Sequence, residues 1–302
     1  MGGFARLFCG AVLALILVPA LPGCAAPSPA PVPPASTPTA VTPAPSTTAP
    51  PVPAATSAPL PAATTRLATP ATTAAPVTRI QWLGQSAFLL TSSRGTRVLI
   101  DPFNASTGYP VTPLDGVDAV LVTHEHGDHN NVKLATGDPA VIRGLTATGW
   151  NTVDQAVKDL RVFSPSPAIP VYHDNQQGAQ RGRNTIFVIE VDGLRLAHLG
   201  DLGHVLDAAA VKALGKLDVV IVPVGGVYTL DAPGATQVIS QLEPRIVVPM
   251  HYKTPRMQAS WPGSGVEPFL AGKRVERPAG SVLSLSVGAL PSSTTVVVLN
   301  YE

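Results

Sequence analysis

Cysteine is almost absent from this sequence. The 302 residues include only two cysteines, Cys9 and Cys24, and both lie within the first 24 residues. The rest of the chain therefore contains no disulfide bond and offers no thiolate to a metal ion.

An excess of charge of one sign is also lacking. Lys and Arg together number 20 and Asp and Glu number 19, which gives a formal net charge of +1. A nucleic-acid partner held mainly by electrostatic attraction is therefore not expected. No basic helix and no strip of mixed aromatic and basic residues contradicts this conclusion.

Charged and large apolar side chains are scarce in residues 25–78. Arg66 is the single charged residue there, and no acidic residue occurs before Asp101. Ala, Pro, Thr, Ser and Val dominate, and this composition offers too little apolar surface to offset the entropy of folding. We expect residues 25–78 to form a disordered, proline-rich linker that acts as a passive tether.

The first 24 residues resemble an export signal. Arg6 supplies a positive start, residues 7–20 are apolar and uncharged, and residues 21–24 resemble the cleavage box of a bacterial lipoprotein. We therefore expect a signal peptide at 1–24, a lipid on Cys24 that anchors the protein to a membrane, and a location outside the cytoplasm in the cell envelope. An uncleaved membrane anchor is the alternative, because the apolar run is near the lower limit for a spanning helix.

Residues 79–302 have the length of one large domain. Apolar runs of strand length recur along it, at 80–84, 87–90, 97–100, 118–123, 186–191, 194–199, 218–223 and 245–250. The runs at 118–123 and 218–223 are continuous, which is typical of strands buried on both faces. They resemble each other closely enough to suggest a duplicated half.

Helices are predicted between some of these strands. Asp207 to Leu214 forms one helix that Gly215 ends, and residues 232–242 form another that Asp231 caps. Residues 143–170 are ambiguous, and a helix at 152–160 is the weak expectation there. Strands and helices thus alternate in both halves, with hairpins among them. This pattern favours an α+β fold in which two mixed β-sheets pack face to face with helices outside.

The strongest functional signal follows the first buried strand. Residues 124–129 read His-Glu-His-Gly-Asp-His, so three imidazoles and two carboxylates fall within six positions. They stand where a buried parallel strand ends, which is where α/β sheets place their sites. In a tight loop, His124 and His126 can point to one side and Asp128 and His129 to another, so one segment could serve two metal ions. Imidazole nitrogen and carboxylate oxygen are the ligands that zinc accepts where no thiolate is available.

The spacing His124-x-His126-x-Asp128-His129 resembles the signature of the metallo-β-lactamase superfamily. The residues at 198–201 and 249–252 are similar to the branch that contains ascorbate-lactonase-like proteins and the N-acylphosphatidylethanolamine phospholipase D enzymes. The resemblance extends from about residue 79 to the last strands. It implies the four-layer αβ/βα sandwich of this superfamily and the activity of a metallo-hydrolase.

The resemblance also implies two metal ions in the domain, with zinc expected and Mn²⁺ or Fe²⁺ as alternatives. The first ion would take the two leading histidines of the motif and a later histidine, which by chain order is His173. The second ion would take the remaining motif residues and His251, and Asp201 would bridge both ions. The implied metal ligands are His124, His126, Asp128, His129, His173, Asp201 and His251.

Other residues have weaker assignments. His198 lies inside a predicted strand, so we expect a packed histidine there, and it replaces His173 as a ligand if His173 lies far away. His204 is assigned a catalytic role as a proton donor, with surface exposure as the alternative, and Asp101 is expected to bond a ligand histidine. Further residues expected to shape the pocket or contact the substrate are Asp174, Asn184, Gly225, Gly226, Tyr228, Tyr252 and Lys253.

The predicted reaction is hydrolysis of an ester, lactone, phosphodiester or amide bond in a small-molecule or lipid-derived substrate. Two metal ions would share a water, present hydroxide as the nucleophile and polarise the bond, while Asp128 orients the water. The sequence contains no Gly-x-Ser-x-Gly elbow near the sheet, which argues against a serine hydrolase. The missing thiolate argues against antibiotic hydrolysis.

Two alternatives from other classes remain. A metal-binding envelope protein without turnover is one, although the complete ligand set argues against it. An iron-based redox enzyme on the same fold is the other, although no flavin-binding domain or additional carboxylate ligand is evident. The sequence does not indicate the oligomeric state.

Overall fold

The computed structural model describes residues 75–166 and 168–301. The expected signal at 1–24 and residues 25–74 of the expected linker lie outside the described residues. The first strand, β1, begins at Thr78, one residue before the expected start of the domain. Among the helices of the described part, none is both long enough and apolar enough to cross a membrane.

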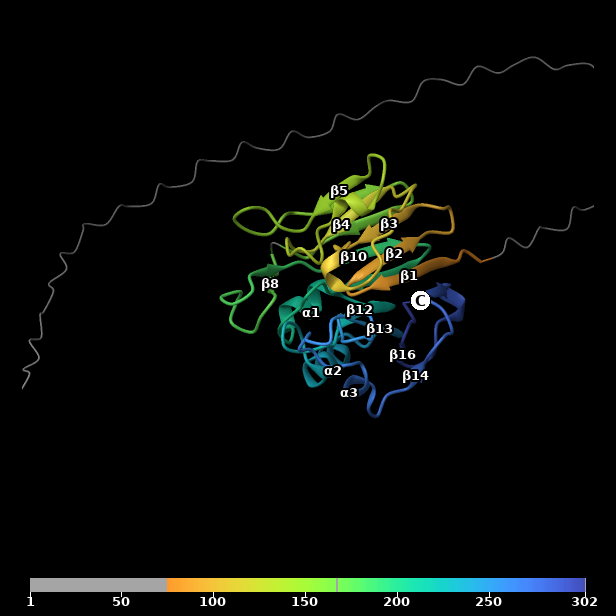
Figure 1. The fold of residues 1–302 in the computed structure, drawn as a ribbon. Coiled ribbons are helices and arrows are strands. Elements are labelled where there is room, and N and C mark those ends of the chain that lie inside the picture. Colours follow the sequence, from red (N-terminus) through yellow and green to blue (C-terminus); the bar gives the residue numbers. More distant parts are fainter. Residues whose placement is uncertain (1–74, 167, 302) are drawn as a thin grey trace, which may run out of the picture. The chain divides into compact units, whose positions relative to one another are not determined.

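Two β-sheets dominate the described chain (Figure 1). The first has six strands in the order β15-β1-β2-β3-β4-β5, and its three-strand group β3, β4 and β5 is parallel. The other neighbours pair antiparallel. The strands are β1 (Thr78–Gly84), β2 (Ala87–Thr91), β3 (Arg97–Ile100), β4 (Ala119–Val122), β5 (Ala140–Arg143) and β15 (Val282–Leu285).

The second sheet has eight strands in the order β14-β16-β13-β12-β11-β10-β7-β6. Its strands from β14 to β11 pair parallel, and β10, β7 and β6 add antiparallel pairs at the other side. The strands are β6 (Asp154–Val157), β7 (Leu160–Phe163), β10 (Phe187–Val191), β11 (Leu194–His198), β12 (Val219–Pro223), β13 (Ile246–Met250), β14 (Val275–Glu276) and β16 (Thr295–Val297). A separate small pair consists of β8 (Val171–Tyr172) and β9 (Arg183–Asn184).

The helices are short, and their ends follow the expected signals. Asp207 accepts a hydrogen bond from the backbone N–H of Ala210 at 2.7 Å and caps α1. Asp231 does the same for α2 through Gly234 at 2.8 Å. The helices are α1 (Ala208–Leu214), α2 (Ala232–Leu242) and α3 (Glu267–Leu270), with 3₁₀ turns η1 (Ala105–Thr107), η2 (Val132–Leu134) and η3 (Val287–Ala289).

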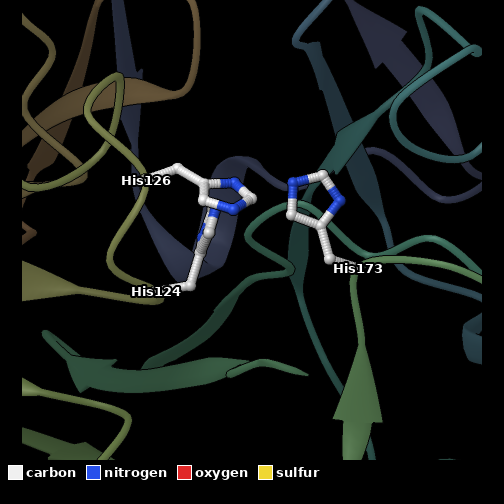
Figure 2. A group of neighbouring side chains, drawn as sticks. All are labelled: His124, His126 and His173. Carbon is white, nitrogen blue, oxygen red and sulfur yellow. The ribbon is translucent and has the colours of Figure 1, made fainter. Parts of the chain in front are cut away.

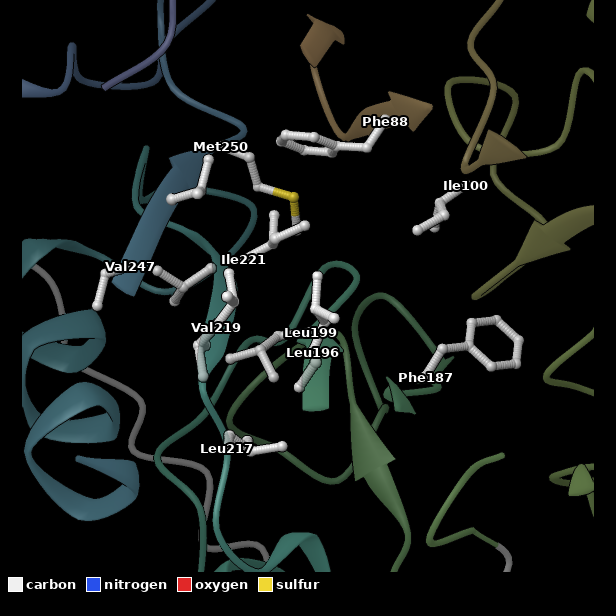
Figure 3. Packing of buried hydrophobic residues seen from close by; sticks show 14 of the residues in the cluster. Phe88, Ile100, Phe187, Leu196, Leu199, Leu217, Val219, Ile221, Val247 and Met250 are labelled. Carbon is white, nitrogen blue, oxygen red and sulfur yellow. The ribbon is translucent and has the colours of Figure 1, made fainter. Parts of the chain in front are cut away.

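The main hydrophobic core lies between the two sheets. Phe88 and Ile100 of the first sheet belong to the same buried cluster as Ile221 and Met250 of the second, and Figure 3 shows part of this packing. Side chains alternate along each strand, so Leu89, Leu99 and Val120 lie on the other face of the first sheet, away from this core. Burial of these apolar surfaces from water is the main force that holds the sheets together.

The outer faces of the two sheets are covered differently. The α-helices lie beside the second sheet, and α2 packs against β12 (Figure 1). The outer face of the first sheet carries a smaller apolar cluster in which Leu89, Leu99 and Val120 pack with Leu134 of η2. The prediction of two mixed sheets packed face to face, with helices outside, is confirmed, and the outer layer over the first sheet is thin.

One prediction of secondary structure was wrong. Residues 152–160 form no helix, because β6 and β7 make an antiparallel hairpin there. Lys158 takes a left-handed backbone conformation with φ of 52°, which turns the chain between the two strands. Val157, Leu160 and Val162 are buried in the main core. Pairing of β7 with β10 thus outweighs the local helical tendency of the segment.

Candidate metal centre

The His-rich motif forms the loop that follows β4. His124 and His129 are buried, with exposed fractions of 2% and 0%, whereas His126 is exposed. The backbone N–H of His129 donates to the carbonyl of His126 at 3.0 Å. This tight turn presents the imidazoles and the Asp128 carboxylate from a single short segment.

Three histidines form a first group. The ligand atoms of His124, His126 and His173 lie within 4.8 Å of one another. The ring centroid of His126 is 4.7 Å from that of His124 and 4.9 Å from that of His173. Figure 2 shows the three rings turned toward a common space, with His173 facing the motif from the end of β8. The third histidine is therefore the one that chain order indicated.

A second group contains two carboxylates and two histidines. The ligand atoms of Asp128, His129, Asp201 and His251 also lie within 4.8 Å of one another. The rings of His129 and His251 are stacked at an interplanar angle of 18°, with centroids 6.0 Å apart. The structure thus brings together all seven side chains that the resemblance assigned as metal ligands.

Asp201 lies between the two groups. Its Oδ2 is 3.1 Å from Nε2 of His129 and 3.2 Å from Nε2 of His251. The same oxygen is 3.1 Å from Nε2 of His173 and 3.8 Å from Nε2 of His124, which belong to the first group. A single carboxylate oxygen therefore faces histidines from both groups.

The backbone around Asp201 is held by Asn184. The Asn184 side chain accepts from the backbone N–H of Asp201 at 3.0 Å and donates to the carbonyl of Leu199 at 2.8 Å. Gly200, between Leu199 and Asp201, has a φ of 54°. A Cβ at Gly200 would stand 2.3 Å from Oδ1 of Asn184. Only glycine fits this position, so the turn places the carboxylate next to the histidines.

Three of the five histidines are oriented by hydrogen bonds to their Nδ1 atoms. Nδ1 of His124 bonds Thr123 Oγ1 at 3.0 Å, and Nδ1 of His173 bonds the carbonyl of Tyr228 at 3.0 Å. Nδ1 of His129 lies 3.0 Å from Asp101, which also accepts from the backbone and hydroxyl of Thr123. Such partners leave Nε2 turned inward and fix the tautomer that a metal requires.

The inward nitrogens fit a metal ion. Nε2 of His124 and Nε2 of His129 are buried, and neither has a hydrogen-bond partner in the described part of the chain. A buried polar atom without a partner is costly, and a metal ion would satisfy both. The donors are imidazole nitrogen and carboxylate oxygen without sulfur, a set that suits zinc and also Mn²⁺ or Fe²⁺.

Burial and neighbouring charges shift the pKa values of the cluster in opposite directions. Burial, reinforced by the neighbouring His129, lowers the pKa of His124 well below its usual range and favours the neutral imidazole that binds metals. Nearby carboxylates, Asp201 first, outweigh burial at His129 and His173 and raise the pKa of both. Burial would raise the pKa of Asp201, but the imidazoles of His129 and His251 hold it well below its usual value. Asp128 shows the same balance, since His129 outweighs its burial and lowers its pKa. Both carboxylates are thus ionised at neutral pH.

The two remaining candidate histidines lie outside the cluster. Both ring nitrogens of His198 are used by backbone groups, with Nε2 bonding the carbonyl of Ser86 at 3.0 Å and Nδ1 accepting from Gly200. His204 accepts from the backbone N–H of Tyr172 at 3.1 Å and bonds the carbonyl of Val205 at 2.9 Å. The structure does not bring His204 into the cavity at the cluster, and its geometry gives the predicted catalytic role no support.

The weaker candidates divide into two kinds. Tyr228 lines the cavity at the cluster, as expected. Tyr252 is buried against Trp82, with ring centroids 5.4 Å apart, and Lys253 donates to the carbonyls of Ala259 and Trp261 at 2.7 and 2.8 Å. These two residues therefore support neighbouring structure and do not line that cavity.

Gly225, one of the residues expected to shape the pocket, lies where the backbone passes close to a ligand segment. A Cβ at Gly225 would stand 2.2 Å from the carbonyl oxygen of His251. The loop after β12 therefore passes directly against the backbone that carries one of the ligands. Any larger residue would displace His251.

Three residues at the site were not predicted from the sequence. Gln85, in the turn between β1 and β2, donates from Nε2 to Oδ2 of Asp128 at 3.0 Å, and its carbonyl accepts from the backbone N–H of His251 at 3.2 Å. Arg181 and Trp261 line the cavity at the cluster. Gln85 has a left-handed backbone conformation with φ of 50°. This local feature is visible in the structure, and no sequence pattern indicates it.

The comparisons with known proteins agree with this geometry. A family model described as the beta-lactamase superfamily domain matches residues 79–251. A metal-dependent hydrolase of Archaeoglobus fulgidus is 32% identical over 197 residues, which cover 58% of this chain and 84% of the relative. A metal-dependent hydrolase of Thermococcus onnurineus is 31% identical over 212 residues, which cover 63% of this chain and 88% of the relative.

A solved structure is similar over most of the described residues. It is a candidate zinc-dependent hydrolase of the metallo-β-lactamase superfamily from Thermotoga maritima, with 30% identity and a TM-score of 0.57. The match covers 74% of this chain and 98% of that one. The chain therefore belongs to the beta-lactamase superfamily and is a metal-dependent hydrolase with the metallo-β-lactamase fold.

Proposed function

We propose that this protein is a di-metal hydrolase, with zinc as the native metal, that cleaves an ester, lactone, phosphodiester or amide bond of a small-molecule or lipid-derived substrate. The observation that carries the proposal is the position of Asp201. Its Oδ2 lies 3.1 Å from Nε2 of both His129 and His173, which belong to different ligand groups. A carboxylate shared in this way suits two neighbouring cations better than one.

The first cation would be held by His124, His126 and His173, and the second by Asp128, His129 and His251, with Asp201 common to both. When bound, such a pair of cations activates water as a nucleophile and stabilises negative charge on the scissile carbonyl or phosphoryl group. The fully nitrogen and oxygen donor set supports zinc, as does the similar candidate zinc-dependent hydrolase of Thermotoga maritima.

Asp128 is the residue best placed to orient the attacking water. Its side chain is 32% exposed, and it lines two cavities that also share Tyr228 and Trp261. Its carboxylate is ionised and can accept a hydrogen bond from a water molecule in the cavity. Gln85 donates to Oδ2 of Asp128 and so restricts how the carboxylate can turn.

The proposal is tested by metal analysis together with turnover. The protein is loaded with zinc, its metal content is measured by mass spectrometry, and activity is assayed on 4-nitrophenyl acetate, δ-valerolactone, bis(4-nitrophenyl) phosphate and 4-nitroacetanilide. We expect two zinc ions per chain, turnover of at least one substrate, and loss of turnover after chelation that returns with zinc. Two bound ions without turnover of any of the four substrates would favour a metal-binding envelope protein.

We further propose that residues 1–24 direct export and that a lipid on Cys24 tethers the domain to a membrane outside the cytoplasm. The support is the apolar run at 7–20 and its position before Cys24. The full chain is expressed in a bacterium beside Cys24→Ala, and membrane and soluble fractions are compared. Mass spectrometry of the N-terminal peptide should detect a lipid on Cys24. An unmodified Cys24 in a mature N-terminus would contradict the proposal.

A further inference from the structure

The cavity at the metal-ligand cluster has a volume of about 340 Å³. Apart from side chains of the cluster itself, its lining consists of Arg181, Tyr228 and Trp261. Arg181 is the one Lys or Arg residue in that lining. Its positive charge therefore faces the space that a substrate would occupy.

The guanidinium of Arg181 has no acidic partner. Arg143 and Arg161 on the surface each lie 2.7 Å from a carboxylate, whereas Arg181 makes no ion pair with any residue in the described ranges. Its Nη1 donates to Gln180 at 3.2 Å, and its guanidinium stands 5.5 Å from the ring centroid of Tyr228. A guanidinium carries five N–H donors, so most of them remain for a ligand.

The loop that carries Arg181 is held in place by Asp174. The carboxylate of Asp174 is buried and accepts hydrogen bonds of 2.7–3.0 Å from four backbone N–H groups of the loop. One of the four donors is the N–H of Arg181 itself, at 2.7 Å. Asp174 directly follows the ligand His173, whose own N–H donates to the carbonyl of Gly182 at 3.0 Å. The backbone of Arg181 is thus fixed relative to the metal-ligand cluster.

A second cavity of about 430 Å³ adjoins the first and shares Asp128, Tyr228 and Trp261 with it. Its lining contains no Lys or Arg, and apart from Asp128 its polar lining is uncharged. These polar residues are Gln85, Asn104, Ser106, Thr107, Gln258 and Ser260. The two cavities therefore differ in their lining, because only the cavity at the cluster has a cationic side chain, Arg181, beside its metal-ligand candidates.

We propose that Arg181 binds an oxyanion of the substrate, a carboxylate or a phosphate, while the bond to be cleaved lies at the metal-ligand cluster. This inference rests on the proposed hydrolase function and narrows its substrates to anionic ones. The planar guanidinium can donate two parallel hydrogen bonds to either oxyanion. The uncharged part of the substrate extends into the second cavity.

The test uses the zinc-loaded protein and two 4-nitrophenyl esters of equal acyl length. One is the half-ester of glutaric acid, which carries a terminal carboxylate, and the other is the valerate, which is neutral. We expect wild-type kcat/KM to be higher for the glutarate half-ester. Arg181→Gln should lower kcat/KM roughly 10- to 100-fold for that ester and leave the valerate nearly unchanged, because a charged hydrogen-bond pair is lost.

Arg183→Gln is the matched control. Arg183 lies two residues away, stacks over Trp150 at 5.5 Å and is absent from the cavity lining. Its kinetics should match those of the wild type. Arg181→Lys keeps the positive charge but loses the two parallel N–H donors of the guanidinium. Its kcat/KM for the glutarate half-ester should lie between those of the wild type and Arg181→Gln. Thermal unfolding of each variant checks that the loop has not lost its fold.

A binding measurement separates failure of this inference from failure of the hydrolase proposal. Glutarate and phenyl phosphate are titrated into the zinc-loaded protein, and quenching of tryptophan fluorescence is followed, since Trp261 lines the cavity. Weaker binding of either anion by Arg181→Gln, without turnover of these esters or of the four substrates named above, would support the anion site and contradict the proposed di-metal hydrolase. Ester turnover with an equal effect of Arg181→Gln on both esters would overturn the inference and keep the hydrolase.

Discussion

The strands β4 and β12, one in each half of the molecule, begin in the same way and end differently. Asp118 precedes β4, and its carboxylate accepts from the backbone N–H of Arg97 at 2.9 Å. Asp218 precedes β12, and its carboxylate accepts from the backbone N–H of Arg195, also at 2.9 Å. Both strands are buried along their whole length. The loop after β4, however, carries four metal-ligand side chains, and the loop after β12 carries none.

The second half supplies its ligands from separate loops. His173 follows β8, Asp201 follows β11 and His251 follows β13. Because β11, β12 and β13 are parallel neighbours, their carboxyl ends lie at one edge of the sheet. The loop after β12 runs between two of these ligands, where Gly225 packs against His251. The first half thus builds its share from one continuous segment. The second half takes Asp201 and His251 from the ends of parallel strands in one sheet and His173 from the separate β8–β9 pair.

The largest expected effect comes from removing the residue that joins the two halves. Asp201→Ala deletes the carboxylate that faces histidines of both groups. We expect metal content to fall from two ions to fewer than one and kcat/KM to fall roughly a thousand-fold, equivalent to about 4 kcal/mol. Asp207→Ala, which removes a helix cap of the same half, is the control and should keep both ions. Two tightly held ions in Asp201→Ala would show that the halves do not meet through this carboxylate.

The next comparison removes one ligand from each half. His126→Ala affects the group that contains His173, and His251→Ala affects the group that contains Asp128. Each variant should retain one metal ion and lose roughly 100-fold or more in kcat/KM. Metal analysis after dialysis provides the measurement. Loss of both ions from either variant would mean that the two groups bind as a single unit.

The difference between the halves explains how much the sequence could predict. Residues 124–129 are neighbours in the chain, so their residue types alone indicated a metal site. For the other half, the predicted strand around His198 indicated a packed histidine, but the resemblance to a family was needed to name His173 as the third histidine. His198 belongs to the core because its Nε2 bonds the carbonyl of Ser86, a contact between segments 112 residues apart. No local pattern encodes such a contact.

The other features that the sequence did not predict also depend on contacts that form only in the folded chain. The segment 152–160 has a hairpin because β7 pairs with β10, which lies 24 or more residues further along the chain. Arg181 lines the cavity because Asp174 organises the loop between β8 and β9. Gln85 reaches Asp128, which is 43 residues away. Strand-forming runs and helix caps were predictable because their causes are local, and these contacts were not.

Gln85 gives a smaller effect that links the two halves from outside the ligand set. Its side chain bonds Asp128 of the first half, and its carbonyl accepts from His251 of the second. Gln85→Leu removes only the side-chain bond, and we expect kcat/KM to fall roughly 10-fold with both metal ions retained at high zinc. Titration with zinc should show weaker binding of one ion. Gln81→Leu, a partly buried position in the strand β1 that precedes the turn of Gln85, is the control. Unchanged zinc affinity in Gln85→Leu would remove Gln85 from the metal centre.

The smallest effect tests the shared beginning of β4 and β12. Asp118→Ala and Asp218→Ala each remove a carboxylate that accepts a backbone N–H, and we expect each to lower the free energy of unfolding by about 1–2 kcal/mol. Chemical denaturation at neutral pH measures both. Asp118 also lies 2.6 Å from Lys158, but that lysine is 64% exposed and should add little. Clearly unequal losses of unfolding free energy in the two variants would mean that β4 and β12 begin with the same geometry but that the two carboxylates do not stabilise the fold equally.

The pH dependence of the Asp118 variant shows whether charge is the cause. Burial tends to raise the pKa of the Asp118 carboxyl, but the hydrogen bonds from Lys158 and from the Arg97 backbone hold it below its ordinary value of 3.8. A carboxyl whose pKa is lower in the folded state stabilises the protein above its unfolded pKa, and this contribution disappears as the pH falls through the folded pKa. The difference in unfolding free energy between wild type and Asp118→Ala should therefore be constant near neutral pH and shrink in acid. A difference that persists in acid would come from packing around the side chain, and the correspondence with Asp218 would then rest on shape and not on the carboxylate.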